Sequence, residues 1–432
     1  MHPSCQIVRR SLTMFSLILA GEAIFCLPFH ISRFFRPTFL EVFEFDNTQV
    51  GILGSIYGVV AMLAYVWGGG LADRFSVRKL LTFALFSTGL GGFYLAEIPS
   101  FSGMAMLYLF WGVTTILPFW AALIRATREW GGSTQQGKAF GLLDGGRGLL
   151  AAGLATLAVY LIQISFPENL EGLKHADQLA GLQAVIYMYT LTCITASVFV
   201  WLFVPPAKPV KTVVKSNREQ VDRLLQVMKI PAVWLQALIV ICAYCTFKGS
   251  DYYSLYASDA YGMNEVDAAK VSAWSAWLRP VAAMGAGFLA DRLKTSRVMI
   301  ACFGLLVVFY VSFATSAAGM STIWILWANV LMTSTAIFAL RGIYFALLEE
   351  ASVPADVTGT AVGIVSFLGF TPEIFMPPLA GWLVDRWPGE VTGYQQLFSL
   401  LAGISAVGVL ASWGVRRIQW KNVNAASVDA KV

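Results

Sequence analysis

The 432-residue chain is 57% hydrophobic and only 13% charged, with a mean hydropathy of +0.67. Soluble proteins carry about 25% charged residues, so the composition excludes a soluble globular protein and predicts an integral membrane protein. The net charge of +5 does not indicate nucleic-acid binding, because Lys and Arg in a membrane protein first report which face of the bilayer a loop occupies.

Apolar windows of about 20 residues, long enough to span a bilayer, recur along nearly the whole chain. They predict an all-α membrane protein with twelve transmembrane helices. The expected helices are 12–32, 47–71, 80–97, 103–125, 139–162, 182–204, 232–257, 267–290, 297–317, 321–347, 358–383 and 394–415. The Arg pair at 9–10 before the first helix resembles a signal peptide, but no small-residue cleavage site follows it, so this stretch is kept as a spanning helix.

The distribution of cations predicts the topology. Twenty-one of the 30 Lys and Arg residues fall in the termini and the loops on the same side, whereas four fall in loops on the opposite side. The positive-inside rule therefore places both termini in the cytoplasm of a multi-pass protein of the cell inner membrane. We expect a monomer whose surroundings are the lipid bilayer.

Two sequence repeats indicate a duplication. Residues 69–79 (GGLADRFSVRK) reappear in altered form 218 positions later as 287–297 (GFLADRLKTSR). A second pair of glycine-spaced segments, 137–141 and 359–363, has nearly the same offset. Parallel repeats of six helices are a transporter architecture. We expect two pseudo-symmetric six-helix bundles, an N-terminal one over 1–204 and a C-terminal one over 232–432, joined by a cytoplasmic linker over 205–231.

The 69–79 and 287–297 loops resemble the signature loop of the major facilitator superfamily, and the resemblance covers essentially the whole chain. The first copy departs from the family pattern at Ser76 and Val77. The resemblance implies alternating access, with these loops in the cytoplasmic gate. Its gating residues would be Gly69, Asp73, Arg74, Arg78, Asp291 and Arg292. The alternative is that both loops are cationic topology signals.

Within the superfamily, the chain resembles the YihN-type permeases over its whole length. Residues 353–363 and 244–249 are also similar to segments of the organophosphate/phosphate antiporters. In the second segment Lys248 stands near the place where those antiporters have a phosphate-binding arginine. Lysine cannot form the bidentate fork, so the substrate class is left open by this likeness.

Charged residues inside the predicted helices indicate a polar pathway. An ionised side chain in the middle of a span costs about 2.5–3.5 kcal/mol, so each needs a partner or a wet cavity. Helices 1, 7 and 10 line the pathway in this superfamily. The candidate substrate-binding residues are Arg33, Lys248, Arg341 and Arg147, with Tyr252 and Tyr256 beside Lys248. Arg341 stands out because it has no acid three or four residues away.

Three acids are candidates for proton coupling, because burial favours the protonated carboxyl: Glu22, Glu373 and Asp144. Other interpretations stay open. Glu22 and Glu373 could be permanent counter-ions of the cations. Asp144 and Asp251, each three residues from a cation, could neutralise Arg147 and Lys248 within one helix, and Arg36 is expected as a surface charge at the outer mouth.

Enzyme motifs are not expected to act here. Residues 132–139 approach a phosphate-binding loop but end in Ala139, without the hydroxyl that holds magnesium. The six cysteines and three histidines have no metal-binding spacing, so no cofactor or metal is expected. The sequence thus predicts a secondary active transporter, not an enzyme, that moves a small organic anion such as an organophosphate or a sugar acid by proton symport or anion exchange. The alternatives are an exporter of apolar or cationic compounds and a transporter-like membrane sensor.

Overall fold

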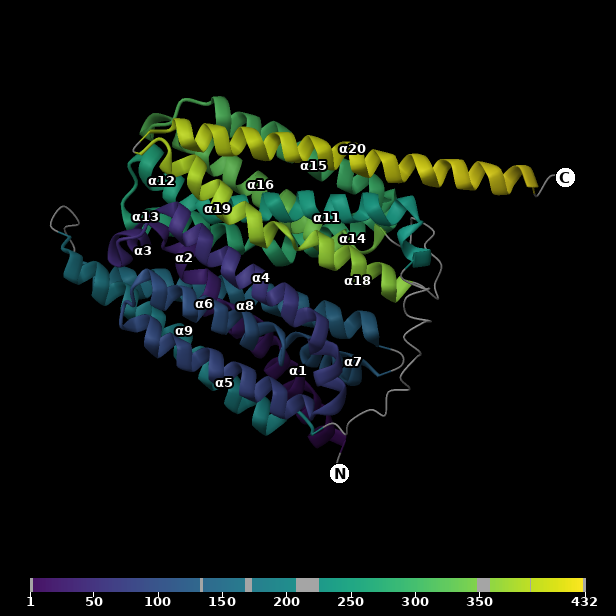
Figure 1. Cartoon of the computed structure of the whole chain (residues 1–432), viewed down its shortest axis with the longest axis horizontal. Coiled ribbons are helices and arrows are strands. Elements are labelled where there is room, and N and C mark those ends of the chain that lie inside the picture. Colours follow the sequence, from purple (N-terminus) through teal and green to yellow (C-terminus); the bar gives the residue numbers. More distant parts are fainter. Residues whose placement is uncertain are drawn as a thin grey trace.

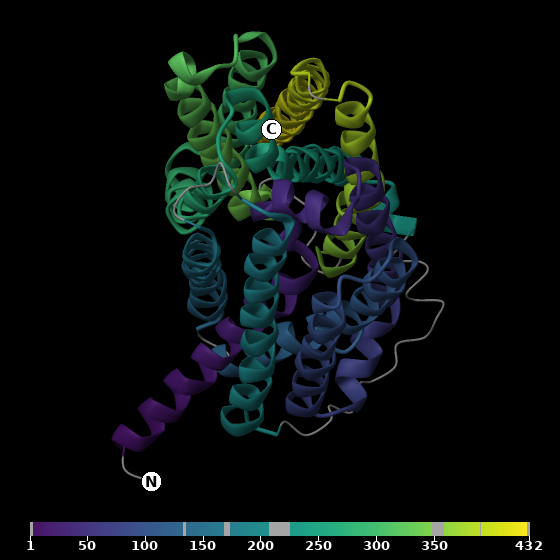
Figure 2. The same cartoon turned by 90° about the vertical axis from the view of Figure 1, so that its left-hand side faces the viewer.

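The computed structural model describes residues 3–132, 135–167, 173–206, 225–347, 358–388 and 390–429. Within them the chain forms a bundle of long helices that run roughly side by side, with the N-terminal half and the C-terminal half stacked on each other (Figures 1 and 2). The N-terminus and the C-terminus both lie toward the same end of the bundle. The opposite end, which carries α3 (Arg36–Phe43), is called the far end below.

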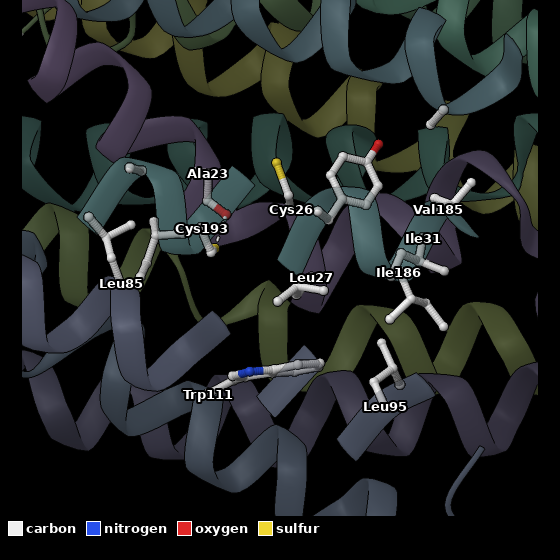
Figure 3. Close-up of a cluster of buried hydrophobic side chains, with 14 of the residues drawn as sticks. Ala23, Cys26, Leu27, Ile31, Leu85, Leu95, Trp111, Val185, Ile186 and Cys193 are labelled. Atoms are coloured by element: carbon white, nitrogen blue, oxygen red, sulfur yellow. Dashed lines mark hydrogen bonds between the residues drawn. The ribbon is translucent and has the colours of Figure 1, made fainter. Parts of the chain in front are cut away.

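Twelve helical segments are present in the described residues, and the predicted all-α membrane fold is confirmed. The first six begin with α1 (Pro3–Phe25), the π turn η1 (Cys26–His30) and α2 (Ile31–Phe34), which together form the first segment. The next five segments are α4 (Asn47–Arg74), α5 (Val77–Ala96), α6 (Phe101–Ile116) with α7 (Trp120–Gly131), α8 (Gln136–Ser165) and α9 (His175–Phe203). Figure 3 shows the apolar core of this half, where Leu27 and Trp111 face Leu95.

The second six repeat the pattern with more breaks. They are α11 (Pro231–Gly249) with η3 (Ser250–Tyr252) and α12 (Tyr253–Tyr261), α13 (Glu265–Ala276) with α14 (Leu278–Leu293), α15 (Thr295–Thr315), η4 (Met320–Thr322) with α16 (Ile323–Ile343), α18 (Thr358–Gly369) with α19 (Pro372–Asp385), and α20 (Thr392–Asp429). The helical segment α20 is longer than the predicted 394–415, because no glycine or proline follows Gly414 to end it. Most of the linker, residues 207–224, lies outside the described residues.

Prolines lie at three of the breaks within segments. Pro28 lies in the π turn, Pro118 separates α6 from α7, and Pro372 begins α19. A proline removes one backbone hydrogen bond and its ring clashes with the preceding turn, so a helix bends or restarts there. Eleven described helices are long and apolar enough to cross a membrane by themselves. The twelfth segment, α13 with α14, falls short because it is broken at Trp277 and carries several charges.

The two halves meet most closely where α4 packs against α19. Glycines on one face of α4 allow this: a Cβ built at Gly51 would lie 2.5 Å from the Pro377 carbonyl oxygen, and one at Gly58 would lie 3.1 Å from Glu373. Small residues at such contacts let helix backbones approach each other in a membrane. Because the contact joins opposite halves, it must change if the halves rock against each other.

The substitution Gly51→Val should force the far end apart. Its side chain would overlap the backbone of Pro377 and Pro378, which cannot give way as a flexible side chain could. We expect the spin-label distance between positions 44 and 387, on the two sides of this contact, to lengthen by several ångströms. Gly153→Val on α8 is the matched control, because a Cβ there meets nothing within 4 Å. An unchanged distance in Gly51→Val would mean that α4 and α19 can stay closed without this close approach.

Candidate functional site

Glu22 on α1 is the centre of a buried cluster of charges. Its carboxylate lies 3.4 Å from Arg147 Nε on α8, 3.5 Å from Arg279 Nη1 on α14 and 3.4 Å from His30 Nε2 in η1. The side chain is 2% exposed. One carboxylate is therefore shared by two guanidinium groups, one from each half of the chain.

Lys248 on α11 belongs to a second cluster. Its Nζ lies 3.1 Å from Asp251 Oδ2 and 3.0 Å from Glu373 Oε1 on α19. Arg33 on α2 contacts Asp251 at 2.5 Å, and the Tyr244 hydroxyl donates a hydrogen bond of 2.7 Å to Glu373. This cluster joins the halves and is balanced, with two cations and two acids.

Arg341 on α16 has no carboxylate partner among the described residues. Its guanidinium lies over the Phe247 ring at 3.9 Å and over the Tyr244 ring at 5.6 Å. Nη1 is buried without a hydrogen-bond acceptor in the described part of the chain. A cation over an aromatic face gains roughly 0.5–2 kcal/mol, which does not replace the hydrogen bonds that its N–H groups lack.

Two tyrosines lie near charged residues of both halves. Tyr344 lies within electrostatic range of Arg341, Arg279 and Asp144. Tyr65 on α4 lies within the same range of Tyr344, Glu373 and Arg147. Neither tyrosine was singled out from the sequence. Their signal was weak, because each sits near the end of an apolar run and acquires charged neighbours only through packing.

The predicted substrate residues fall into three groups. Arg341 has no acid partner in the described chain, whereas Arg147 contacts Glu22 and Asp144. Arg33 and Lys248 both contact Asp251, and Lys248 also contacts Glu373. Tyr252 lines a small cavity of about 30 Å³ with Lys248, Asp251 and Arg36. Tyr256 is placed elsewhere: it is 1% exposed and packs in the aromatic core of the C-terminal half, against Phe313, Tyr394 and Phe398.

Among the predicted proton carriers, Asp144 does not meet the condition of burial, because its side chain is 76% exposed. It lies 3.5 Å from Arg147, as its i, i+3 spacing predicts. Glu22 and Glu373 are buried and both contact cations. Both therefore have the geometry of the counter-ions that the sequence left open.

The far end is closed by contacts between the halves. Asp385 at the end of α19 accepts hydrogen bonds from Asn47 and Thr48 at the start of α4, including both backbone N–H groups. Glu265 on α13 accepts hydrogen bonds from Thr38 and Gln178. These acids were missed from the sequence.

Arg36 also belongs to this closure, and the expectation of a surface charge there is wrong. It is only 4% exposed, and it donates hydrogen bonds of 2.7 Å to Asn47 Oδ1 and 3.2 Å to the Tyr252 hydroxyl. Its guanidinium also lies over the Tyr252 ring at 4.2 Å. The start of α3 is thus tied to α4 within its own half and to η3 of the other half.

The predicted gating loops lie at the other end of the bundle. Arg74, Asp291 and Arg292 are exposed and form no ion pair with a described residue. Arg78 is directed into its own half, with its guanidinium over the Trp201 ring at 4.7 Å. The surroundings of Gly69 and the side chain of Asp73 lie outside what the structure describes. So do residues 353–357, the first part of the segment similar to the organophosphate/phosphate antiporters. No ion pair joins the described side chains of these two gating loops across the halves.

Comparison with known proteins identifies the family. The model of the Major Facilitator Superfamily matches residues 13–375, most of the chain. The chain belongs to this superfamily. The predicted family is thereby confirmed, and the protein is a membrane transporter of a small molecule, not an enzyme.

Relatives in the superfamily cover nearly the full length. The chain is 26% identical to the inner membrane protein YqcE of Escherichia coli over 93% of both chains, and 24% identical to the inner membrane protein YihN over 98% of this chain and 100% of that one. Two solved structures share the fold. One is a bacterial homologue of the human lysosomal transporter Spinster, with a TM-score of 0.73 and 12% identity over 98% of both chains. The other is a mutant of the nucleoside transporter NupG, with a TM-score of 0.72 and 15% identity over 94% of this chain and 99% of that one.

Proposed function

We propose that this transporter carries a small organic anion, such as an organophosphate or a sugar acid, across the inner membrane as a monomer that works by alternating access. The observation that carries the proposal is that Arg341 and the Glu22 cluster hold more cations than acids. Arg341 has no acidic partner in the described chain, and Arg147 and Arg279 share the buried carboxylate of Glu22, with only the exposed Asp144 beside Arg147. Unmatched charges in a membrane are costly, and a visiting anion would offset that cost.

The binding roles follow from which N–H groups are free. Arg341 is the primary anion contact, because Nη1 is buried and has no acceptor in the described chain. Arg147 is the second, because it contacts Glu22 and Asp144 only at 3.4–3.5 Å, distances longer than those of strong charge-assisted bonds. Arg33 and Lys248 are held by Asp251 and Glu373, so they reach a substrate only if that cluster opens.

The conformation is proposed to be inward-facing. The far end is closed by Asp385, Glu265 and Arg36, whereas Arg74 and Arg292 at the other end form no ion pair across the halves with a residue that the structure describes. The excess of cations at the end with the termini supports a cytoplasmic position for both termini. Opening the far end must then break the contacts of Asp385 with α4 while the signature loops, including Asp73, engage at the cytoplasmic side.

Transport by the purified chain in proteoliposomes tests the proposal. The probes are labelled glycerol 3-phosphate, D-glucuronate and inorganic phosphate, with labelled tetraphenylphosphonium as a cationic compound. We expect saturable uptake of at least one anion, driven either by an inward proton gradient or by a second anion trapped inside. Liposomes without protein are the control. Flux of the cation alone would favour the exporter alternative, and saturable anion binding without flux would favour a sensor; either result contradicts the proposal.

A further inference from the structure

A π turn, η1, interrupts the first transmembrane segment between α1 and α2. π turns are rare and occur mostly at functional sites. The apolar side of this turn packs into the core of the N-terminal half, where Figure 3 shows Cys26, Leu27 and Ile31 among neighbouring helices. Its last residue, His30, lies on the polar side, toward Glu22.

The π turn brings His30 over Glu22. In a regular α-helix, residues eight apart are about 80° apart around the axis and do not face each other. A π turn contains one residue more than an α-helical turn. Residues eight apart across it are therefore placed much as residues seven apart are in a regular α-helix, close to two full turns. His30 Nε2 therefore comes to lie 3.4 Å from Glu22 Oε1.

Both side chains are buried and incompletely bonded. His30 is 4% exposed and Glu22 is 2% exposed. Neither His30 Nδ1 nor Glu22 Oε2 has a hydrogen-bond partner in the described chain. A neutral imidazole that holds its proton on Nε2, toward Glu22, leaves the Nδ1 lone pair open. That lone pair can take up a proton, and the carboxylate beside the ring stabilises the resulting imidazolium.

Titratable residues from several helices surround His30 and Glu22. The titratable neighbours are Glu22 on α1, Cys26 in η1, Arg33 on α2, Arg147 on α8, Tyr189 and Cys193 on α9 and Arg279 on α14. The titratable residues of α5, which also packs against η1, lie in its first and last turns. Arg33 is matched by Asp251. The charge that His30 senses is thus set by one carboxylate and two shared arginines.

We propose that His30 binds the coupled proton of this transporter and that its protonation frees Arg147 and Arg279 to hold the anion. When His30 is neutral, Glu22 offsets one of the two guanidinium charges. A proton from water on His30 Nδ1 adds one positive charge, and the imidazolium competes with the arginines for Glu22. The anion then binds more tightly, and by reciprocity the bound anion retains the proton. Proton and anion travel together and leave together, which is symport.

This inference rests on the proposed function but has a test that needs no transport. The chain has three histidines, so His2→Gln and His175→Gln leave His30 as the single imidazole in the full-length protein. With ¹⁵N-labelled histidine in lipid nanodiscs, NMR measures the ratio of imidazolium to neutral imidazole at His30 at fixed pH. We expect a measurable imidazolium population that falls as the pH is raised. Glycerol 3-phosphate or D-glucuronate should raise the ratio.

Two variants of opposite sign complete the test. Glu22→Gln removes the neighbouring anion and should lower the ratio at least about tenfold, whereas Arg279→Gln removes a neighbouring cation and should raise it. If Glu22→Gln fails to fold, the ratio measured in Arg279→Gln still tests the proposal by itself. The proposal is overturned if His30 stays neutral throughout, if both variants leave the ratio unchanged, or if neither anion changes it. Failure of the proposed function is separate, because it is the absence of anion flux in proteoliposomes.

Discussion

Replacing Arg341 by alanine is expected to abolish anion transport and to leave the folded protein intact. Truncating one member of a buried charge pair costs about 2–5 kcal/mol, which corresponds to a loss of about 30-fold or more in anion binding. Stability should not fall in parallel, because Arg341 has no acid in the described chain that would be left unpaired. Uptake of the transported anion and the melting temperature of the purified variant measure the two effects.

Two further substitutions sharpen this result. Arg341→Lys keeps the charge but loses the planar fork, so it should recover only part of the affinity. Arg386→Ala is the matched control, because Arg386 also stacks on an aromatic ring, Trp382 at 5.3 Å, but is exposed at the far end. Full activity in Arg341→Ala would contradict its assignment as the primary anion contact. A large loss of stability would show that it has a partner that the anion does not replace.

The sequence predicted local charge pairs well. Asp144 with Arg147 and Lys248 with Asp251 are three residues apart, and each pair is formed at 3.1–3.5 Å. Such pairs depend only on helix geometry. The architecture was predictable for a similar reason. The thickness of the bilayer sets the length of each apolar run, and the backbone limits of proline and glycine set where helices break or end.

Partners from distant helices could not be predicted in this way. Arg33 and Asp251 lie 218 residues apart, and Glu22 meets Arg279 only because α1, α8 and α14 converge. Which acid neutralises which cation is a property of packing between helices, and one sequence contains no direct record of it. For this reason the sequence alone left two roles open for Glu22 and Glu373, proton carrier or counter-ion of a cation.

The position of Asp385 at the end of a predicted helix was a usable sequence signal for a contact between helices. An acid in the last turn of a helix opposes the helix dipole, so its presence there needs another positive partner. The start of α4 supplies one, in the N–H groups of Asn47 and Thr48. An acid at a helix C-terminus is therefore a hint of contact with a second helix, although the sequence does not say which.

The second large effect is expected at Lys248, and it concerns stability. Lys248→Met would leave Glu373 buried without its cation and Asp251 with Arg33 alone. Breaking a buried ion pair by removing one partner costs about 3–5 kcal/mol. We therefore expect a clear drop in the thermal stability of the purified protein, together with loss of transport. Glu373→Gln in the same chain should restore most of the stability, because it removes the orphaned charge, but should not restore transport.

Lys270→Met is the matched control for this cycle. Lys270 also pairs with an aspartate three residues away, at 2.8 Å from Asp267, but the two side chains are 38% and 50% exposed. Exposed pairs contribute about 0–1 kcal/mol, so this variant should stay close to wild type. The interaction between Lys248 and Glu373 follows from the two single variants and the double variant. If Lys248→Met were as stable as Lys270→Met, the cluster would not stabilise the closed far end. Arg33 and Lys248 would then be available, like Arg341, to bind the anion.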